Sequence, residues 1–474
     1  MDEQISRQSN PRRRRKTKME IFRESYLPVI IAAVALVFIF VCIFGAALRG
    51  CSEVPPVENP SAPSDAPSDP PSEPTEDPLL AEAAALVAQA KQLALSYEYQ
   101  AAIDLLDSFR GNPDDYPEVA QLRASCAHQL SQMIGWSDPA QVVNLSFHGL
   151  IADTTRAFAD SRYGTAYNKN FVTTGEFLQI LQQLYENNYV LVSLSDIFTF
   201  EVSSTGHTTC KANTVYLPLG KKPLVITQTN VNYYTYMTDG NGDGLPDASG
   251  DGFASRLIVD ENGKLLCEYV TAAGETLTGG YDLAPILSDF ISAHPDFSYK
   301  GARAVLAVSG YDGIFGYRIN EEVKNTKGQD YYDAQVAGAK KVVEALRAEG
   351  YELACYTYNN VAYGTMAASA IQTDLQKWQA QIEPILGKTD IFVFAQNSAI
   401  SEYTGTKFNL LQNAGFRCYL DFASGRSGAQ VGGTYVVHRR LLVTGSQMYH
   451  NPSAFVGLFD AAAILDPARG RVPQ

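Results

Sequence analysis

Apolar and polar residues follow two alternating patterns through the later part of this 474-residue chain. Short apolar runs rich in β-branched residues predict buried strands, and apolar residues spaced three and four apart predict helices. The predicted strands are 142–147, 189–193, 223–226, 304–308, 353–358, 391–394 and 418–421, and the predicted helices between them are 173–188, 281–294, 333–349, 372–386 and 408–414. Thr174 is the expected N-cap of the first of these helices, with Glu176 in its first turn. Such βα alternation predicts a parallel, barrel-like sheet.

The segment before these strands, 79–136, has a helical pattern. Apolar or small residues recur at Leu86, Ala90, Leu93 and Tyr97, and a Tyr-x-x-Ala-Ile string follows at 99–103. Such helix pairs are similar to one tetratricopeptide-type repeat with a further helix, and one repeat cannot stack into a solenoid by itself. We expect a helical stalk packed on the next domain, and the alternative is a scaffold that holds a protein partner.

The N-terminal part is organised around an uncharged stretch of 22 residues, 27–48. This length spans a hydrocarbon core of about 30 Å as a helix. The basic residues 12–16 precede it, which predicts a cytoplasmic tail over 1–26 and an extracytoplasmic body on a single-pass membrane anchor. The alternative is a cleaved lipoprotein signal that leaves the chain anchored at Cys51. Residues 49–78 are rich in Pro, Ser and acid and predict an extended linker.

The net charge and the cysteine content argue against some classes of protein function and structure. The net charge is −14, and because residues 1–26 carry +4, the rest carries −18. An acidic body argues against nucleic acid as a partner. The seven cysteines are scattered without a Cys-x-x-Cys pair, so we expect buried small apolar residues rather than a disulfide framework.

The order of segments in 137–474 resembles the polysaccharide deacetylase (NodB-type) family. A strand ending in Phe147-His148, the string LYENNYVLVSLSDI at 184–197 and the strand KPLVIT at 222–227 follow the family's order. The later segments 350–360, 390–398, 407–416, 439–440 and 448–452 follow it too. The resemblance implies a distorted (β/α)7 barrel. It also implies metal-assisted hydrolysis of N-acetyl or O-acetyl groups on extracellular glycan.

The family's metal and catalytic positions carry other residues in this chain. The family holds a divalent metal with one Asp and two His and uses a second Asp as the general base. By this resemblance, Thr229 replaces the base, Asn230 the Asp ligand, and Tyr356 and Asn360 the two His. Their side chains are neutral, bind divalent metals weakly and offer no base near neutral pH. We therefore expect a barrel that has lost zinc or another divalent metal and is catalytically impaired.

The alternative is an active deacetylase that uses a displaced site. His148 at a strand end, and His438 in the segment 435–440 with Arg440, could converge on the barrel mouth. Ser309 and Asp312 follow another strand end, but they form no Ser/His/Asp pattern with a histidine. A lone histidine is more often a hydrogen-bonded structural residue than a catalytic one.

A calcium loop is the second candidate site. Asp239, Asn241, Asp243 and Asp247 stand at positions 1, 3, 5 and 9 of a Gly/Asp-rich loop inserted at 239–251, with Gly244 at position 6. This spacing matches EF-hand-like loops up to position 12, where Gly250 stands instead of Glu. Calcium bound there would order the loop beside Asn230, and the competing interpretation is a solvated turn.

Tyrosines cluster near the ends of the two predicted strands, 223–226 and 353–358, that carry the family-equivalent site positions. They are Tyr233, Tyr234 and Tyr236 after the first, and Tyr356, Tyr358 and Tyr363 after the second. Aromatic rings with polar groups suit the faces of sugars. Together with the predicted anchor, they favour a membrane-tethered, deacetylase-like protein that binds or acts on cell-wall or other extracellular glycan.

Overall fold

The structure is a computed structural model that describes residues 78–159, 162–422 and 428–474. The predicted basic tail, membrane span, most of the linker, Cys42 and Cys51 lie outside these residues. Within the described part, no helix is both long and apolar enough to cross a membrane.

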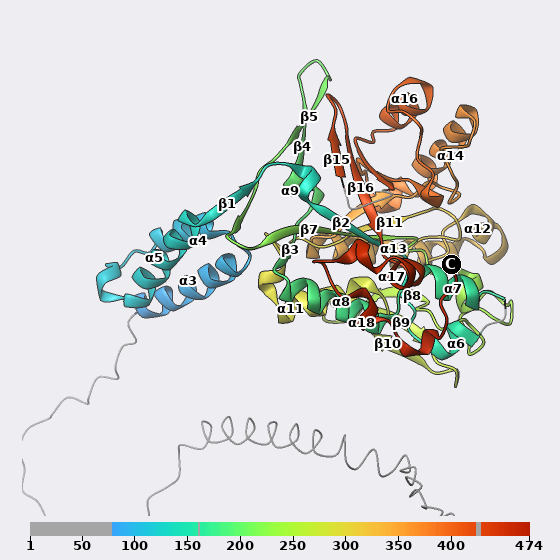
Figure 1. Cartoon of the computed structure of the whole chain (residues 1–474), viewed down its shortest axis with the longest axis horizontal. Coiled ribbons are helices and arrows are strands. Elements are labelled where there is room, and N and C mark those ends of the chain that lie inside the picture. Colours follow the sequence, from blue (N-terminus) through green and yellow to red (C-terminus); the bar gives the residue numbers. More distant parts are fainter. Residues whose placement is uncertain (1–77, 160–161, 423–427) are drawn as a thin grey trace, which may run out of the picture. The chain divides into compact units, whose positions relative to one another are not determined.

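Seven parallel strands close into a barrel (Figure 1). Neighbouring strands pair in the order β11, β12, β13, β14, β16, β2, β7, and β7 pairs again with β11 to complete the ring. Their bounds are β2 (Val143–Phe147), β7 (Lys222–Thr229), β11 (Val305–Val308), β12 (Glu352–Cys355), β13 (Ile391–Val393), β14 (Cys418–Phe422) and β16 (Val436–Leu442). The barrel predicted from the sequence pattern is therefore confirmed. Its last strand, β16, was not among the predicted strands.

Strand β7 is the longest strand of the ring and, like β16, pairs with three neighbouring strands. One edge pairs with β2, and the other pairs first with β3 (Tyr189–Leu191) and then with β11. The predicted strand 223–226 thus continues to Thr229. The predicted strand 353–358 is shorter than expected, because the chain leaves β12 after Cys355 with a positive φ at Thr357.

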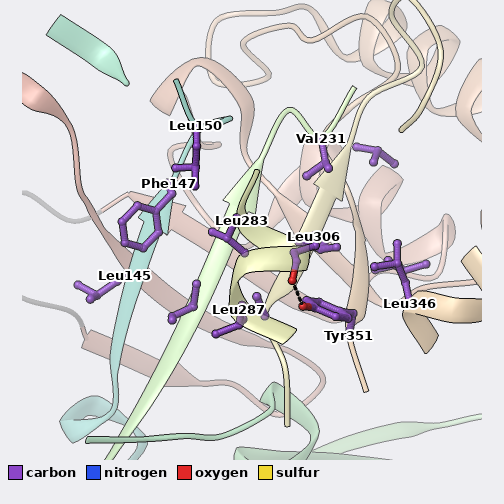
Figure 2. Packing of buried hydrophobic residues seen from close by; sticks show 14 of the residues in the cluster. Leu145, Phe147, Leu150, Val231, Leu283, Leu287, Leu306, Leu346 and Tyr351 are labelled. Atoms are coloured by element: carbon purple, nitrogen blue, oxygen red, sulfur yellow. Dashed lines mark hydrogen bonds between the residues drawn. The ribbon is translucent and has the colours of Figure 1, made fainter. Parts of the chain in front are cut away.

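Side chains alternate between the barrel interior and its outer surface, as the two-residue period of strands requires. On β2, Leu145 and Phe147 face outward and pack with the covering helices, as Figure 2 shows for both residues beside Leu283 and Leu287. Asn144 and Ser146 face inward, where they contact side chains of β7 and β16. Polar interior positions therefore occur along the barrel axis.

Helices and short 3₁₀ turns cover the outside of the barrel. The longer helices are α8 (Thr174–Glu186), α11 (Leu283–Ala293), α13 (Gln329–Glu349), α14 (Ala368–Gln381) and α16 (Gly405–Asn413). The shorter ones are α6 (Thr154–Ala159), α7 (Gly164–Asn170), α9 (Leu194–Ile197), α10 (Thr235–Thr238), α12 (Glu321–Lys327), α15 (Glu383–Leu386), α17 (Gly445–His450) and α18 (Ala461–Ile464).

The N-cap of α8 differs from the prediction by one residue. Thr173, not Thr174, accepts the backbone N–H of Glu176 at 3.1 Å, and the Glu176 carboxylate accepts the backbone N–H of Thr173 at 2.8 Å. This reciprocal capping box satisfies two N–H groups that lack partners within the helix.

Antiparallel strands that the sequence pattern did not predict accompany the barrel. They are β1 (Met133–Trp136) with β6 (Val215–Pro218), β4 (Phe198–Val202) with β5 (Thr208–Ala212), β8 (Arg256–Val259) with β9 (Leu265–Val270) and β10 (Thr276–Gly279), and β15 (Gly428–Val431) on β16. Most have exposed or half-buried side chains, so their apolar alternation is weak in the sequence.

Three helices precede the barrel: α3 (Pro78–Leu95), α4 (Tyr99–Asp107) and α5 (Pro117–Ser131). The Tyr97 hydroxyl after α3 donates to the backbone oxygen of Asp296 at 2.5 Å, and the Lys300 N–H donates to the oxygen of Ser96 at 3.0 Å. These contacts agree with a packed helical unit, while its likeness to a tetratricopeptide repeat stays a prediction. Among the described cysteines, all five are free thiols and four are buried, as expected.

Candidate functional site

The four positions singled out by the family resemblance lie together at the carboxyl end of the barrel. Thr229 ends β7 and Asn230 follows it, while Tyr356 and Asn360 lie in the loop after β12. Asn230 and Asn360 have φ values of 59° and 52°. Asparagine tolerates this left-handed region better than most residues, so both turns suit the residues present.

The Tyr234 hydroxyl connects the two asparagines. It donates to Asn230 Oδ1 at 2.7 Å and lies 3.3 Å from Asn360 Nδ2, which donates to it. The hydroxyl is also 3.4 Å from Ser309 Oγ, after β11. Burial raises the pKa of Tyr234, so the phenol stays protonated and keeps its donor role at neutral pH. Strand ends β7, β11 and β12 thus share one neutral hydrogen-bond network.

A second polar group occupies the barrel interior next to this network. Thr229 Oγ1 lies 2.8 Å from Nδ1 of half-buried His148, after β2. Thr229 also hydrogen-bonds the side chain of Tyr356, whose pKa burial raises despite the nearby positive charge of Arg440. Burial, with a smaller contribution from Arg440, lowers the pKa of His148 to about 4. His148 is therefore neutral at physiological pH.

His438 does not reach this end of the barrel. Its Nε2 lies 3.0 Å from the oxygen of Val142, and its Nδ1 lies 3.4 Å from Nδ2 of Asn144. Val142 immediately precedes β2 and His148 immediately follows it, so the two histidines occupy opposite ends of the interior. The predicted convergence of His148 and His438 is wrong. His438 is fully buried and hydrogen-bonded, as in the structural alternative.

Asp282, the N-cap residue of α11, is a site residue that the sequence pattern missed. Its side chain is 2% exposed and accepts hydrogen bonds from the Leu150 N–H at 2.9 Å, Gln228 Nε2 at 2.8 and 2.9 Å, and the Tyr233 hydroxyl at 2.7 Å. An Asp at the start of a predicted helix, here 281–294, is ordinarily interpreted as an N-terminal helix residue, which gave no signal for this role. Burial raises the pKa of its carboxyl. Because both oxygens already accept hydrogen bonds, Asp282 holds three segments together rather than serving as a free base.

A small cavity adjoins the Tyr234 network. Its volume is about 90 Å³, and aromatic and aliphatic side chains form most of its wall: Leu150, Phe171, Tyr233, Tyr234, Tyr236, Met237, Phe253 and Ala254, with Gly149, Asn230, Asp282 and Asn360 as the remaining residues. One water needs roughly 10–15 Å³ of such space, so the cavity admits a group the size of a few waters. An apolar wall with two amides at one side suits a small polar group that carries a methyl.

An open groove lies next to this cavity and shares Tyr236 with it. The groove has a volume of about 680 Å³ and includes Tyr311, Tyr358 and the edge of the Gly/Asp loop. Tyr234 and Tyr236 stack with ring centroids 5.7 Å apart, and Tyr236 and Tyr311 are 46% and 53% exposed. Of the six tyrosines predicted to form a glycan surface, Tyr236 is exposed at this groove. Tyr233, Tyr234, Tyr356, Tyr358 and Tyr363 are instead buried. Glycan binding by these rings stays a prediction.

The residues at the family's metal positions do not fit a divalent metal. Asn230 Oδ1 already accepts the Tyr234 hydroxyl, Asn360 presents its Nδ2 to the same hydroxyl, and Tyr356 is a buried neutral phenol. No carboxylate or imidazole stands at these three positions, and these are the ligands that divalent metals prefer. Within the described ranges, no group of three or more His, Cys, Asp or Glu side chains is placed to hold a metal ion.

The Gly/Asp loop closes on itself through its own side chains. The Asp239 carboxylate accepts the N–H groups of Gly242 and Gly244, both at 2.6 Å. Asp247 accepts the N–H groups of Asn241 at 3.1 Å and Ser249 at 2.6 Å, and these backbone bonds lower its pKa although burial opposes them. The calcium assignment for Asp239, Asn241, Asp243 and Asp247 stays a prediction.

Calcium titration tests this loop directly. If the loop binds calcium, we expect a dissociation constant of about 10⁻⁴–10⁻³ M, the range of extracellular modules. Isothermal titration calorimetry should then show that Asp239→Ala removes the binding, while Asp260→Ala, in an exposed turn outside the loop, leaves it unchanged. Equal binding by both variants would contradict the assignment.

Comparisons with known proteins give only distant likenesses. No protein-family model matches the chain, and no curated protein matches it. The Streptococcus pyogenes deacetylase PplD in complex with acetate superposes with a TM-score of 0.35 at 13% identity, covering 65% of this chain and 95% of that one. A Mycobacterium smegmatis protein whose assignment as a polysaccharide deacetylase is provisional gives 0.20 at 12% identity, covering 30% and 41%. Both TM-scores lie below 0.5, so the barrel is described from this chain's own strand pairing.

Proposed function

We propose that this protein is a catalytically impaired, polysaccharide deacetylase-like protein that binds N-acetylated extracellular glycan at its barrel mouth. The observation that carries the proposal is the neutral Asn230–Tyr234–Asn360 network beside a small apolar cavity. Asn230 and Asn360 stand where the family resemblance places metal ligands, and Tyr234 joins them. They offer hydrogen bonds to an amide but no ligand set for a metal and no base.

The cavity and groove suit an acetamido sugar in two parts. The apolar side chains of Leu150, Met237 and Phe253 would contact the acetyl methyl, and the amide of Asn360 would bond the acetamido group. The exposed ring of Tyr236 lies at the edge of the groove, where it would stack on a sugar face. Buried, already satisfied Asp282 would take no part in the chemistry.

Binding of chitooligosaccharides to the full-length protein tests this proposal. Asn360→Ala removes one hydrogen-bonding group, so we expect about 3- to 10-fold weaker binding, corresponding to about 1 kcal/mol. Asn325→Ala, an equivalent change at an exposed position of α12, serves as the control and should bind like the wild type. If the wild type, Asn360→Ala and Asn325→Ala bind with equal affinity in isothermal titration calorimetry, the cavity is not the glycan-binding site.

We also propose that residues 27–48 anchor the chain in the cell membrane as a single span, with residues 1–26 cytoplasmic. The described part of the chain would then be extracytoplasmic and reach cell-wall glycan across the acidic linker. Lipid attachment at Cys51 is the alternative anchor, and a protein partner of the helices α3–α5 is a further proposal. These rest on the sequence alone.

A further inference from the structure

Arg440 is a buried cation without a counter-ion. It projects from β16 into the barrel interior and is 1% exposed. Its guanidinium donates to Ser146 Oγ at 2.8 Å and to the backbone oxygen of Phe394 at 3.2 Å. Within the described residues, its Nε has no hydrogen-bond partner and no carboxylate lies within ion-pair distance of it. The other buried arginine, Arg469, is by contrast paired with Glu176 at 2.5 Å.

An uncompensated guanidinium in this position is unfavourable. Burial lowers the pKa of Arg440, yet arginine keeps its charge in proteins because its ordinary pKa is above 12. Both hydrogen-bond acceptors are neutral, so the desolvation of the charge is not offset by an anion. A fold that retains such a group holds an electrostatic preference for a negative ligand at this point.

The charge of Arg440 reaches two neutral side chains that follow strand ends of the barrel. Its charge acts on His148 and Tyr356, which approach from the strand ends of β2 and β12. Both are neutral, and both hydrogen-bond Thr229. Asp421 is the carboxylate whose charge reaches Arg440, but its oxygens accept the Phe422 N–H at 2.6 Å and the Tyr403 hydroxyl at 3.3 Å. His148 is half-buried and directly follows β2 at the carboxyl end of the barrel.

We propose that Arg440 anchors an oxyanion site in the barrel mouth, which takes the carboxylate of an acidic sugar. A planar guanidinium with unused N–H groups matches a carboxylate better than a compact cation would. The site deepens the proposed glycan-binding function and rests on it: a sugar that places its acetamido group in the apolar cavity would present a carboxylate of the same or the next residue to Arg440. The fixed positive charge also disfavours a divalent metal at the neighbouring positions.

The test titrates the full-length protein with sodium glucuronate, sodium acetate, sodium phosphate and glucose at constant ionic strength, followed by calorimetry and thermal unfolding. We expect saturable binding of glucuronate and acetate and none of glucose. Arg440→Met should weaken carboxylate binding at least tenfold, and Arg440→Lys should restore only part of it. Glucuronate binding that is unchanged in Arg440→Met, or no carboxylate binding by the wild type, would overturn the proposal.

Two further outcomes of these titrations would also contradict the proposed oxyanion site. Binding of acetate without glucuronate would contradict the assignment to a sugar, and binding of phosphate alone would contradict the assignment to a carboxylate. Ser146→Asp, at the position whose Oγ lies 2.8 Å from Arg440 Nη1, provides a second variant if Arg440→Met does not fold, as judged by circular dichroism. Its carboxylate would pair with Arg440, so we expect a higher unfolding temperature and loss of acetate binding. Binding of neutral chitooligosaccharides is measured in the same experiments. If the wild type does not bind them, the proposed glycan-binding function is refuted, independently of the result for the oxyanion site.

Discussion

Arg469→Met is expected to lower the free energy of unfolding by about 3–5 kcal/mol, because it leaves the buried Glu176 carboxylate without its cation. The two side chains are each 1% exposed and meet through two hydrogen bonds, at 2.5 and 2.6 Å. Arg469 also donates to the backbone oxygens of Asn168 at 2.8 Å and Phe171 at 2.7 Å. One guanidinium thus joins the C-terminal segment to the start of α8 and the end of α7.

Urea denaturation of matched variants measures this effect. Arg110→Met breaks an ion pair with the same 2.5 Å N–O distance, but Arg110 is 80% exposed, so its loss should destabilise the protein far less than the loss of Arg469. Adding Glu176→Gln to Arg469→Met removes the stranded charge and should recover part of the loss. An Arg469→Met variant no less stable than Arg110→Met would contradict the ion-pair interpretation.

Stability is expected to fall as the pH drops from about 6.5 towards 4, and His438 contributes a large part of this change. Burial lowers the His438 pKa from 6.5 to about 4 in the folded protein, although bonds to backbone oxygens oppose the shift. Between these values the unfolded chain binds more protons, so protonation favours unfolding. Each pKa unit corresponds to about 1.36 kcal/mol, which gives roughly 3 kcal/mol for His438 across this range. His148, whose pKa is also lowered to about 4, acts in the same direction.

The measurement is the free energy of unfolding at a series of pH values between 4 and 7.5. His438→Gln should flatten the profile between pH 6.5 and 4, even if it lowers stability at pH 7 by disturbing the contact with Val142. His128→Gln changes an exposed histidine of α5 and is the control. Parallel profiles for the wild type and His438→Gln would contradict a buried, neutral imidazole.

The strands of the barrel could be predicted from the sequence where they carry continuous apolar runs. The order in which these strands pair could not be predicted from it. The segments around Leu145, Ile226 and Leu306 are buried on both faces, which gives an uninterrupted signal. The hairpin β4–β5 and strand β10 were missed because few of their side chains are buried in alternation. Strand β9 was missed although its side chains alternate between buried and half-buried. The position of β3 beside β7 depends on pairing distant in the sequence, which a local pattern does not encode.

The candidate site could be predicted only in part. Asn230, Thr229, Tyr356 and Asn360 were found from strand ends and a family resemblance, and the structure places them together. Asp282 was missed because an Asp at the start of a predicted helix is ordinarily interpreted as an N-terminal helix residue, and its contacts to Leu150 and Gln228 are set by tertiary packing. His438 was misplaced because the sequence gives no register for β16 against β2, on which its depth in the barrel depends.

Acetate release measured together with chitooligosaccharide binding tests the central claim most directly. The full-length protein is incubated with N-acetylated oligosaccharide in the presence of zinc, cobalt or a chelator. The account predicts saturable binding that the chelator does not change, and no release of acetate above the background of heat-denatured protein. Acetate release that metal supports and chelator abolishes would contradict it, and would show that the barrel mouth is an active deacetylase centre.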